Sequence, residues 1–205
     1  MISRRALLTA ATASMLVLPL GARAADSAGP VATVSAFYDT LLQAMKNGTR
    51  LGFAGRRELL APAVSKAFDL PMMTRITIGP QWASVSPDEQ QKLVRAFSDY
   101  SVATYANRFD DYSGEKFEVD PKTAPSVGGG VIVHSKLVQS NGEPVELDYL
   151  MHQVVGDGWK IIDIYLSGTI SQLAAQRSEF TSVMRQGGAA ALIQSLRDKA
   201  AQLAS

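Results

Sequence analysis

Asp163 is the residue whose surroundings best suit acid–base chemistry. It stands among three isoleucines, Ile161, Ile162 and Ile164, and a carboxyl group held among apolar side chains can act as a general base. The same surroundings suit a structural carboxylate paired with an arginine. Arg177 is the candidate partner because it interrupts an apolar stripe in the segment that follows. We expect the structural pairing, and a general base is the alternative.

The other residues offer little for catalysis or metal binding. The two histidines, His134 and His152, lie in segments that alternate like strands and lack an obvious third, carboxylate ligand. Gly128–Gly130 precedes a strand rather than a helix, so it does not match a phosphate-binding loop. The sequence has no cysteine, which excludes disulfides and thiolate chemistry. We therefore expect no catalytic residue, no metal and no cofactor.

The first 24 residues have the pattern of a signal peptide. Arg4 and Arg5 give a basic start, Ala6–Leu20 is a small and apolar run, and Ala22–Ala24 has the small-x-small pattern that signal peptidase reads. The apolar run is too short to span a bilayer as a helix. We expect residues 1–24 to be removed and residues 25–205 to form a single exported domain, by the Sec or the twin-arginine route.

The charge of the chain argues against nucleic acid as a partner. The net charge is +1, and the predicted cleavage removes three arginines and no acidic residue. The surface that remains is slightly acidic, whereas binding to nucleic acid requires a basic face. No later segment is apolar for long enough to cross a membrane, so we expect a domain that stays in solution.

Periodic apolar positions predict helices on both sides of a central block of strands. The clearest helix start is the capping box Ser86–Glu89, in which Pro87 takes the first helical position. A second capping box opens at Thr169, and Gly187–Gly188 separates its helix from a last one. The predicted helices cover residues 31–46, 56–68, 71–78, 86–108, 169–186 and the segment after Gly188.

Between Gly114 and Gly168 the apolar period changes to two, which predicts strands. Ser140–Glu143 and Gly156–Gly158 are turn signals, so consecutive strands should pair as antiparallel hairpins. The predicted strands begin at Phe117 and cover residues 117–119, 131–138, 145–152 and 159–166. Together these elements predict an α+β fold, with helices packed around a curved antiparallel sheet of about four strands.

The strand at residues 159–166 is apolar on both faces, so both faces must be covered. The simpler explanation is a central strand with helices over both faces. The alternative is that one face lines a ligand cavity. The wall residues can then be predicted as the apolar residues that share one face of each strand or one face of each helix. The predicted ligand-binding residues are Met73, Ile76, Phe97, Tyr105, Val133, Leu137, Leu147, Tyr149, Met151, Ile162, Ile164 and Leu166.

Three motifs occur in order along this region. In the first motif, a run of Phe-Asp, Met, Arg, Gly and Trp leads into a Ser-Pro-x-Glu helix start. In the second, Thr-Tyr-Ala is followed by Phe and Tyr. In the third, a strand with Tyr and Trp-Lys precedes Asp, Gly and Ser, and an Arg and a Phe come after it. The residues concerned are Phe68, Asp69, Met73, Arg75, Gly79, Trp82, Ser86, Pro87, Glu89, Thr104, Tyr105, Ala106, Phe109, Tyr112, Tyr149, Trp159, Lys160, Asp163, Gly168, Ser171, Arg177 and Phe180. In these residues the sequence resembles the MlaC family of periplasmic phospholipid carriers, also called the toluene-tolerance family.

The resemblance implies a fold related to the NTF2-like shape and a lipid bound by its tails between sheet and helices. It also implies a non-catalytic, periplasmic carrier that moves lipid between an inner-membrane ABC transporter complex and an outer-membrane lipoprotein complex. Phe109–Gly114 and Ser167–Leu173 are similar to the family's hopanoid-biosynthesis-associated branch, so the lipid is a phospholipid or a hopanoid. Two alternatives stay open: an NTF2-like enzyme with Asp163 as general base, and an interaction subunit without a ligand.

Overall fold

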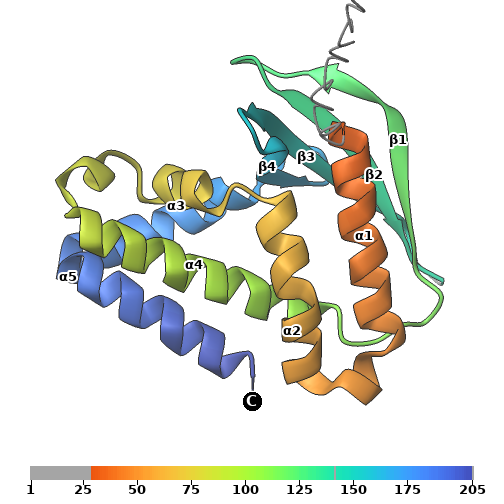
Figure 1. The fold of residues 1–205 in the computed structure, drawn as a ribbon, viewed down its shortest axis with the longest axis horizontal. Helices are drawn as coiled ribbons and strands as arrows, with labels where there is room; N and C mark the ends of the chain where they lie inside the picture. The colour runs from red at the N-terminus through yellow and green to blue at the C-terminus, as the bar shows by residue number, and fades with distance from the viewer. Residues whose placement is uncertain (1–28, 141, 205) are drawn as a thin grey trace, which may run out of the picture.

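The computed structural model describes residues 29–140 and 142–204, so the predicted signal peptide, residues 1–24, lies outside the described residues. Helices occupy both ends of the chain in Figure 1, and the strands lie between them in sequence. The helices are α1 (Pro30–Lys46), α2 (Gly48–Ala67), α3 (Leu70–Ile78), the short 3-10 helix η1 (Gly79–Ser84), α4 (Pro87–Arg108) and α5 (Gln172–Gln202). The strands are β1 (Lys116–Pro125), β2 (Val131–Val138), β3 (Val145–Val154), β4 (Gly158–Leu166) and β5 (Ile170–Ser171).

The strands form one antiparallel sheet in the order β1-β2-β3-β4-β5. This meander confirms the predicted α+β fold. The sheet has five strands rather than about four. The fifth, β5, was not predicted because it contains only Ile170 and Ser171 and is too short to show an alternating pattern. β1 is also longer than predicted, since its pairing continues to Pro125 past a register irregularity between Val119 and Thr123.

The helices are anchored to the sheet mainly through α1 and then extend away from it. Figure 1 shows α1 running along the inner side of β1 and β2, with α2 beside it and α3, α4 and α5 forming a second group. Phe37, Tyr38 and Leu41 of α1 are buried. The ring of Tyr38 stacks on Phe117 of β1 at 4.1 Å, and its hydroxyl lies 2.6 Å from that of Ser135 in β2. Apolar burial and this hydroxyl pair therefore hold α1 to the sheet.

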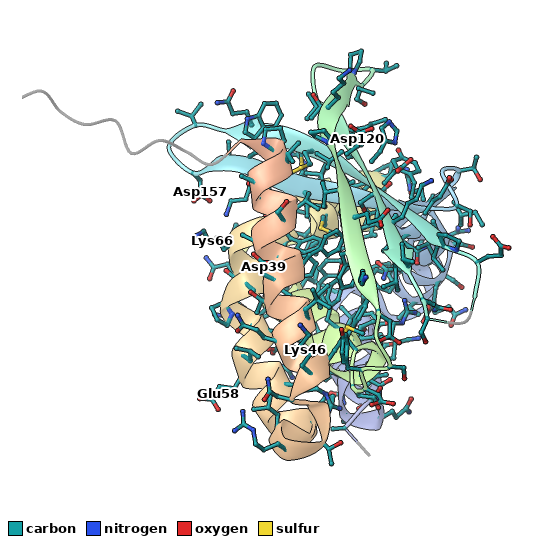
Figure 2. All side chains as sticks on the ribbon, turned by 90° about the vertical axis from the view of Figure 1, so that its right-hand side faces the viewer. Asp39, Lys46, Glu58, Lys66, Asp120 and Asp157 are labelled. Atoms are coloured by element: carbon teal, nitrogen blue, oxygen red, sulfur yellow. The ribbon has the colours of Figure 1, made fainter. Side chains whose placement is uncertain are left out.

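Most charged side chains lie on the outside of these layers, and Arg56, Lys160 and Asp163 are the buried exceptions among the described residues. Figure 2 labels Asp39, Glu58 and Lys66 on the outward side of α1 and α2, and all three are exposed. Carbon-rich side chains crowd the space between helices and sheet in the same view. Within the described part of the chain, no helix is long and apolar enough to cross a membrane.

Local sequence explains where the helices begin and bend. The predicted capping box is present at α4, where Ser86 Oγ accepts a hydrogen bond from Glu89 N and the Glu89 carboxylate accepts one from Ser86 N. The two helices expected after Thr169 lie end to end within α5, and they meet in a kink at Gly188, where the backbone is not helical and φ is 65°. Only glycine adopts this left-handed conformation readily, so the glycine pair produces a kink instead of a loop.

Candidate functional site

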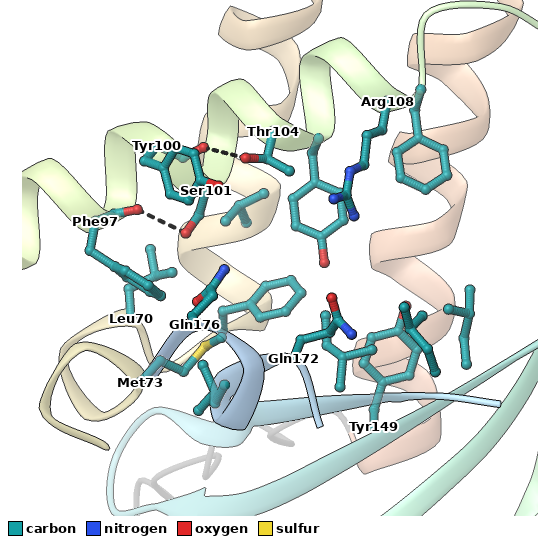
Figure 3. A pocket seen from close by; sticks show the side chains of 18 of the residues that line it. Leu70, Met73, Phe97, Tyr100, Ser101, Thr104, Arg108, Tyr149, Gln172 and Gln176 are labelled. Atoms are coloured by element: carbon teal, nitrogen blue, oxygen red, sulfur yellow. Dashed lines mark hydrogen bonds between the residues drawn. The ribbon is translucent and has the colours of Figure 1, made fainter. Parts of the chain in front are cut away.

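A partly open pocket of about 230 Å³ lies between the inner face of the sheet and helices α3, α4 and α5. This is far more than the roughly 10–15 Å³ that one buried water requires. Most of the wall is apolar, and Figure 3 shows side chains reaching into the space from both the helices and the sheet. The lining residues are Val64, Phe68, Leu70, Met73, Phe97, Tyr100, Ser101, Thr104, Tyr105, Arg108, Phe109, Leu137, Val145, Leu147, Tyr149, Ile164, Leu166, Gln172, Leu173 and Gln176.

The floor of this pocket comes from alternate residues of three neighbouring strands. Tyr149 of β3 pairs with Ile164 of β4, and Leu147 pairs with Leu166. On the other side of β3, Val145 pairs with Leu137 of β2. Directly paired residues in an antiparallel sheet point to the same face. The register therefore presents one continuous apolar surface to the helices.

The roof of the pocket is one stripe of α4. Phe97, Ser101, Thr104 and Arg108 follow one another at spacings of three and four residues, which places them on one side of the helix. The hydroxyls of Ser101 and Thr104 donate 2.8 Å hydrogen bonds to carbonyls one turn earlier in α4. Their polarity is thus satisfied within the helix, and Arg108 is the only charged residue in the lining of the described pocket.

Buried phenols bring hydroxyl groups, but no charge, to this region. Burial raises the pKa of Tyr105 well above its ordinary value; Tyr38 adds to the rise, while the charge of Arg108 opposes it. Burial also raises the pKa of Tyr149, and it raises that of Tyr38 to about 12. All three tyrosines are therefore neutral at physiological pH.

Eight of the twelve predicted ligand-binding residues line the pocket. They come from strands β2, β3 and β4 and from helices α3 and α4, as the alternation and the stripes predict. Whether they bind a ligand stays a prediction. The eight are Met73, Phe97, Tyr105, Leu137, Leu147, Tyr149, Ile164 and Leu166.

The other four predicted residues are not part of the pocket wall. Val133 and Met151 have 0% exposure and belong to the packed core beyond its end. Ile76 packs against the core from the last turns of α3. Ile162 has no partner in β3, because Leu150 pairs with Asp163 and the next residue, Met151, pairs with Ile161. This bulge shifts the alternation of β4 by one residue, which the sequence pattern did not indicate.

The expected pairing of Asp163 with Arg177 is wrong. The Asp163 carboxylate accepts hydrogen bonds from Ser171 Oγ at 2.5 Å, Ile164 N at 2.7 Å and Leu173 N at 3.2 Å. Arg177 instead packs on Gly79, where an added Cβ would lie 2.8 Å from its Nη2. Asp163 is therefore a structural carboxylate that ties β4 to the start of α5, and it is absent from the pocket lining.

Several lining residues escaped prediction because they are polar or lie at the start of a helix. Gln172 and Gln176 project from the first turns of α5, four residues apart on one face. In the sequence, only the spacing of four residues between Gln172 and Gln176 could have indicated that both side chains lie on the same face of the helix. Arg108 continues the α4 stripe, but at the end of a helix an arginine is ordinarily explained by the helix dipole.

The two histidines do not join in one site. His152 Nε2 lies 2.8 Å from Asp69 Oδ2, and His134 Nδ1 lies 3.0 Å from Asp148 Oδ1. These are two separate pairs, and in the described residues no group of three or more His, Cys, Asp or Glu side chains could hold a metal ion.

The fold and the pocket define an α+β protein with a mostly apolar pocket between sheet and helices. The family model for the MlaC protein matches residues 35–198, so the chain belongs to the MlaC family.

The chain is similar to two proteins of known name. The intermembrane phospholipid transport system binding protein MlaC of Haemophilus influenzae is 21% identical over 127 residues, which are 61% of this chain and 59% of that protein. The match thus spans about three fifths of the relative. A phospholipid-binding protein from Ralstonia solanacearum, solved in complex with a phospholipid, is 27% identical with a TM-score of 0.73 and covers 87% of this chain and 100% of its own.

Proposed function

We propose that this protein is a carrier that binds a phospholipid by enclosing its tails in the pocket. The observation that carries the proposal is the apolar pocket of about 230 Å³ between sheet and helices. Membership of the MlaC family supports it, as does the similarity to a protein solved with a phospholipid bound.

The energetics of hydrocarbon in water favour an apolar pocket of this kind. Each CH₂ group gains about 0.8 kcal/mol on burial, so a 16-carbon tail loses roughly 13 kcal/mol when it is moved from a bilayer into water. A carrier that crosses an aqueous gap must offset this loss. The floor of Leu137, Leu147, Ile164 and Leu166 provides apolar surface for that purpose.

The cellular setting follows from the same proposal. An exported carrier of this family would act in the periplasm and exchange lipid with an inner-membrane ABC transporter complex and an outer-membrane lipoprotein complex. The H. influenzae relative carries the name of an intermembrane transport system. A hopanoid in place of the phospholipid remains the second candidate ligand, on the resemblance of Phe109–Gly114 and Ser167–Leu173.

The other two functions have less support. An enzyme that uses Asp163 as general base needs that carboxylate free and next to substrate, but three hydrogen bonds engage it outside the pocket wall. An interaction subunit without a ligand does not require the apolar pocket. We therefore propose no catalytic role.

Native mass spectrometry of the protein purified from a lipid-containing bacterial host tests the proposal. We expect a mass increment that matches one phospholipid, with the lipid identified by extraction. The same protein should then accept a fluorescent phospholipid from donor vesicles and release it to acceptor vesicles. A ligand-free mass under gentle conditions, together with no uptake from vesicles, would contradict the proposal.

A further inference from the structure

A second hollow lies next to the apolar pocket and shares the last turns of α2 with it. It is a partly open groove of about 420 Å³ between α1, α2 and the turn that joins β3 to β4. Val64 and Phe68 of α2 line the pocket, whereas Ala63 and Ala67, each one residue earlier, line the groove. Most of the groove is apolar, and Trp159 is half-buried in its wall. Two spaces with mostly apolar walls therefore lie on either side of one segment of helix.

Three aromatic rings separate the pocket from this groove. Phe68 and Tyr105 line the pocket, and Phe37 of α1 lines the groove. The centroid of the Phe37 ring lies 5.1 Å from that of Phe68 and 5.1 Å from that of Tyr105, and both contacts are edge-to-face. Phe37 is 1% exposed and Phe68 is 3% exposed. The partition is therefore closed, and at this point it is two rings thick.

The pocket is short for the tails of a membrane lipid. A cavity of about 150 Å³ holds one benzene molecule, so by proportion a pocket of about 230 Å³ holds roughly nine carbon atoms. A phospholipid with two long tails has several times as many. A chain that exceeds this space must displace the rings, or the part that does not fit stays in contact with water.

We infer that Phe37 and Phe68 set the length of acyl chain that the pocket accepts, and that the groove behind them is the space into which a longer chain extends when these rings are made smaller. This inference rests on the proposed function, because chain length matters only if the pocket holds hydrocarbon tails.

The chemistry of the partition suits the end of a hydrocarbon chain. Phe37 and Phe68 carry no polar group, and Tyr105 is neutral because burial raises its pKa. The charged residues that line the described groove, Lys66 and Asp157, are exposed and of opposite sign, so they favour neither an anion nor a cation. Closely packed rings yield little. A chain end that reaches them therefore meets a firm, apolar stop.

The dependence of binding on chain length tests the inference. The lipid-free protein is loaded with a fluorescent phospholipid and titrated with monoacyl phosphatidylglycerols whose saturated chain ranges from hexanoyl to stearoyl, each below its critical micelle concentration. The variants are Phe37→Leu, Phe68→Leu and the double variant Phe37→Leu with Ala63→Phe, which fills the groove again. Phe180→Leu is the matched control, since Phe180 is 2% exposed and is absent from the described linings of pocket and groove. Circular dichroism verifies that each variant is folded.

For the wild type, we expect affinity to rise about fourfold with each added CH₂ until the chain end reaches the rings, and then to stay constant. In Phe37→Leu and in Phe68→Leu the rise should continue for about two more carbons, so that the longest chains bind about tenfold more tightly than to the wild type. The double variant should return to the wild-type limit. Phe180→Leu should keep that limit throughout.

Several results would overturn the inference while leaving the carrier proposal intact. A wild type whose affinity rises without a limit up to stearoyl would do so without any variant. The same holds if both single variants keep the wild-type limit, if Phe180→Leu shifts it as far as they do, or if the double variant keeps the longer limit. A wild-type protein that binds none of these lipids and takes up none from vesicles would overturn both.

Discussion

At the scale of single residues, the pocket depends on groups that are not themselves in it. The Asp163 carboxylate accepts a hydrogen bond from the Ser171 hydroxyl. The Ser171 Oγ in turn accepts a hydrogen bond from Ala174 N at 2.9 Å. This chain of bonds fixes the first turn of α5, from which Gln172 and Gln176 project. A helix start anchored in this way satisfies backbone donors that would otherwise lack partners. The buried carboxylate thus positions the helix turn that carries these pocket residues.

Replacing Asp163 by alanine should therefore reduce stability. We expect a loss of about 2–4 kcal/mol in the free energy of unfolding, because Ser171 Oγ and Leu173 N lose a charged acceptor in a site that is 7% exposed. Urea denaturation followed by circular dichroism measures this. The control is Asp99→Ala, which removes an exposed ion pair with Arg57 and should change stability by less than about 1 kcal/mol. Equal losses in both variants would contradict the structural role of Asp163.

At the scale of elements, the sequence predicted regular features well and irregular ones poorly. The capping box at Ser86 and the alternation of β3 both have a local physical cause that is visible in the sequence. The bulge at Ile162 has none, because it arises from how β4 pairs with β3. The wall of the pocket was therefore predicted for Ile164 and Leu166 but not correctly for Ile162.

Gly48 lies at a contact between the α1–α2 junction and the end of α4 that the local sequence does not predict. It lies where α2 follows α1, and its carbonyl accepts a 2.9 Å hydrogen bond from the buried Arg56. Arg56 Nε also donates to Ala106 O of α4 at 2.7 Å. A Cβ at Gly48 would lie 1.8 Å from the carbonyl oxygen of Asp110. This close approach holds the α1–α2 junction against the end of α4, which carries Arg108.

Gly48→Ala should accordingly destabilise the fold. The added methyl collides with backbone rather than with a flexible side chain, so the α2 start and the α4–β1 connection must separate. We expect a loss of more than about 2 kcal/mol in unfolding free energy, as for other overpacked sites. Gly29→Ala is the control, because nothing lies within 4 Å of a Cβ there, and it should change stability by less than about 1 kcal/mol. A Gly48→Ala variant as stable as the wild type would show that this junction is not tightly packed.

At the scale of the whole molecule, the division between packed core and open pocket is the property on which the proposed function depends. Val133, Met151 and Ile161 fill one end of the space between sheet and helices with 0% exposure. Leu147 and Leu166, on the same sheet, face the cavity instead. The alternation in sequence is the same at both ends, so it predicts an inward face but not where packing stops. That boundary depends on how far α1, α3 and α4 lie from the sheet, which is a property of the assembled fold.

Enlarging one residue on each side of this boundary distinguishes pocket from core. Leu166→Trp adds volume where about 230 Å³ is free, so we expect stability within about 1 kcal/mol of the wild type and at least tenfold weaker uptake of a fluorescent phospholipid from vesicles. Val133→Trp adds volume to a fully packed position and should reduce the free energy of unfolding by about 1–3 kcal/mol or more. Thermal unfolding and vesicle uptake measure the two effects. If Leu166→Trp destabilised the protein as much as Val133→Trp, the position would be packed core and not cavity wall. If Leu166→Trp took up lipid as well as the wild type, the cavity would not be the binding space, because a ligand and an added indole ring cannot occupy the same volume.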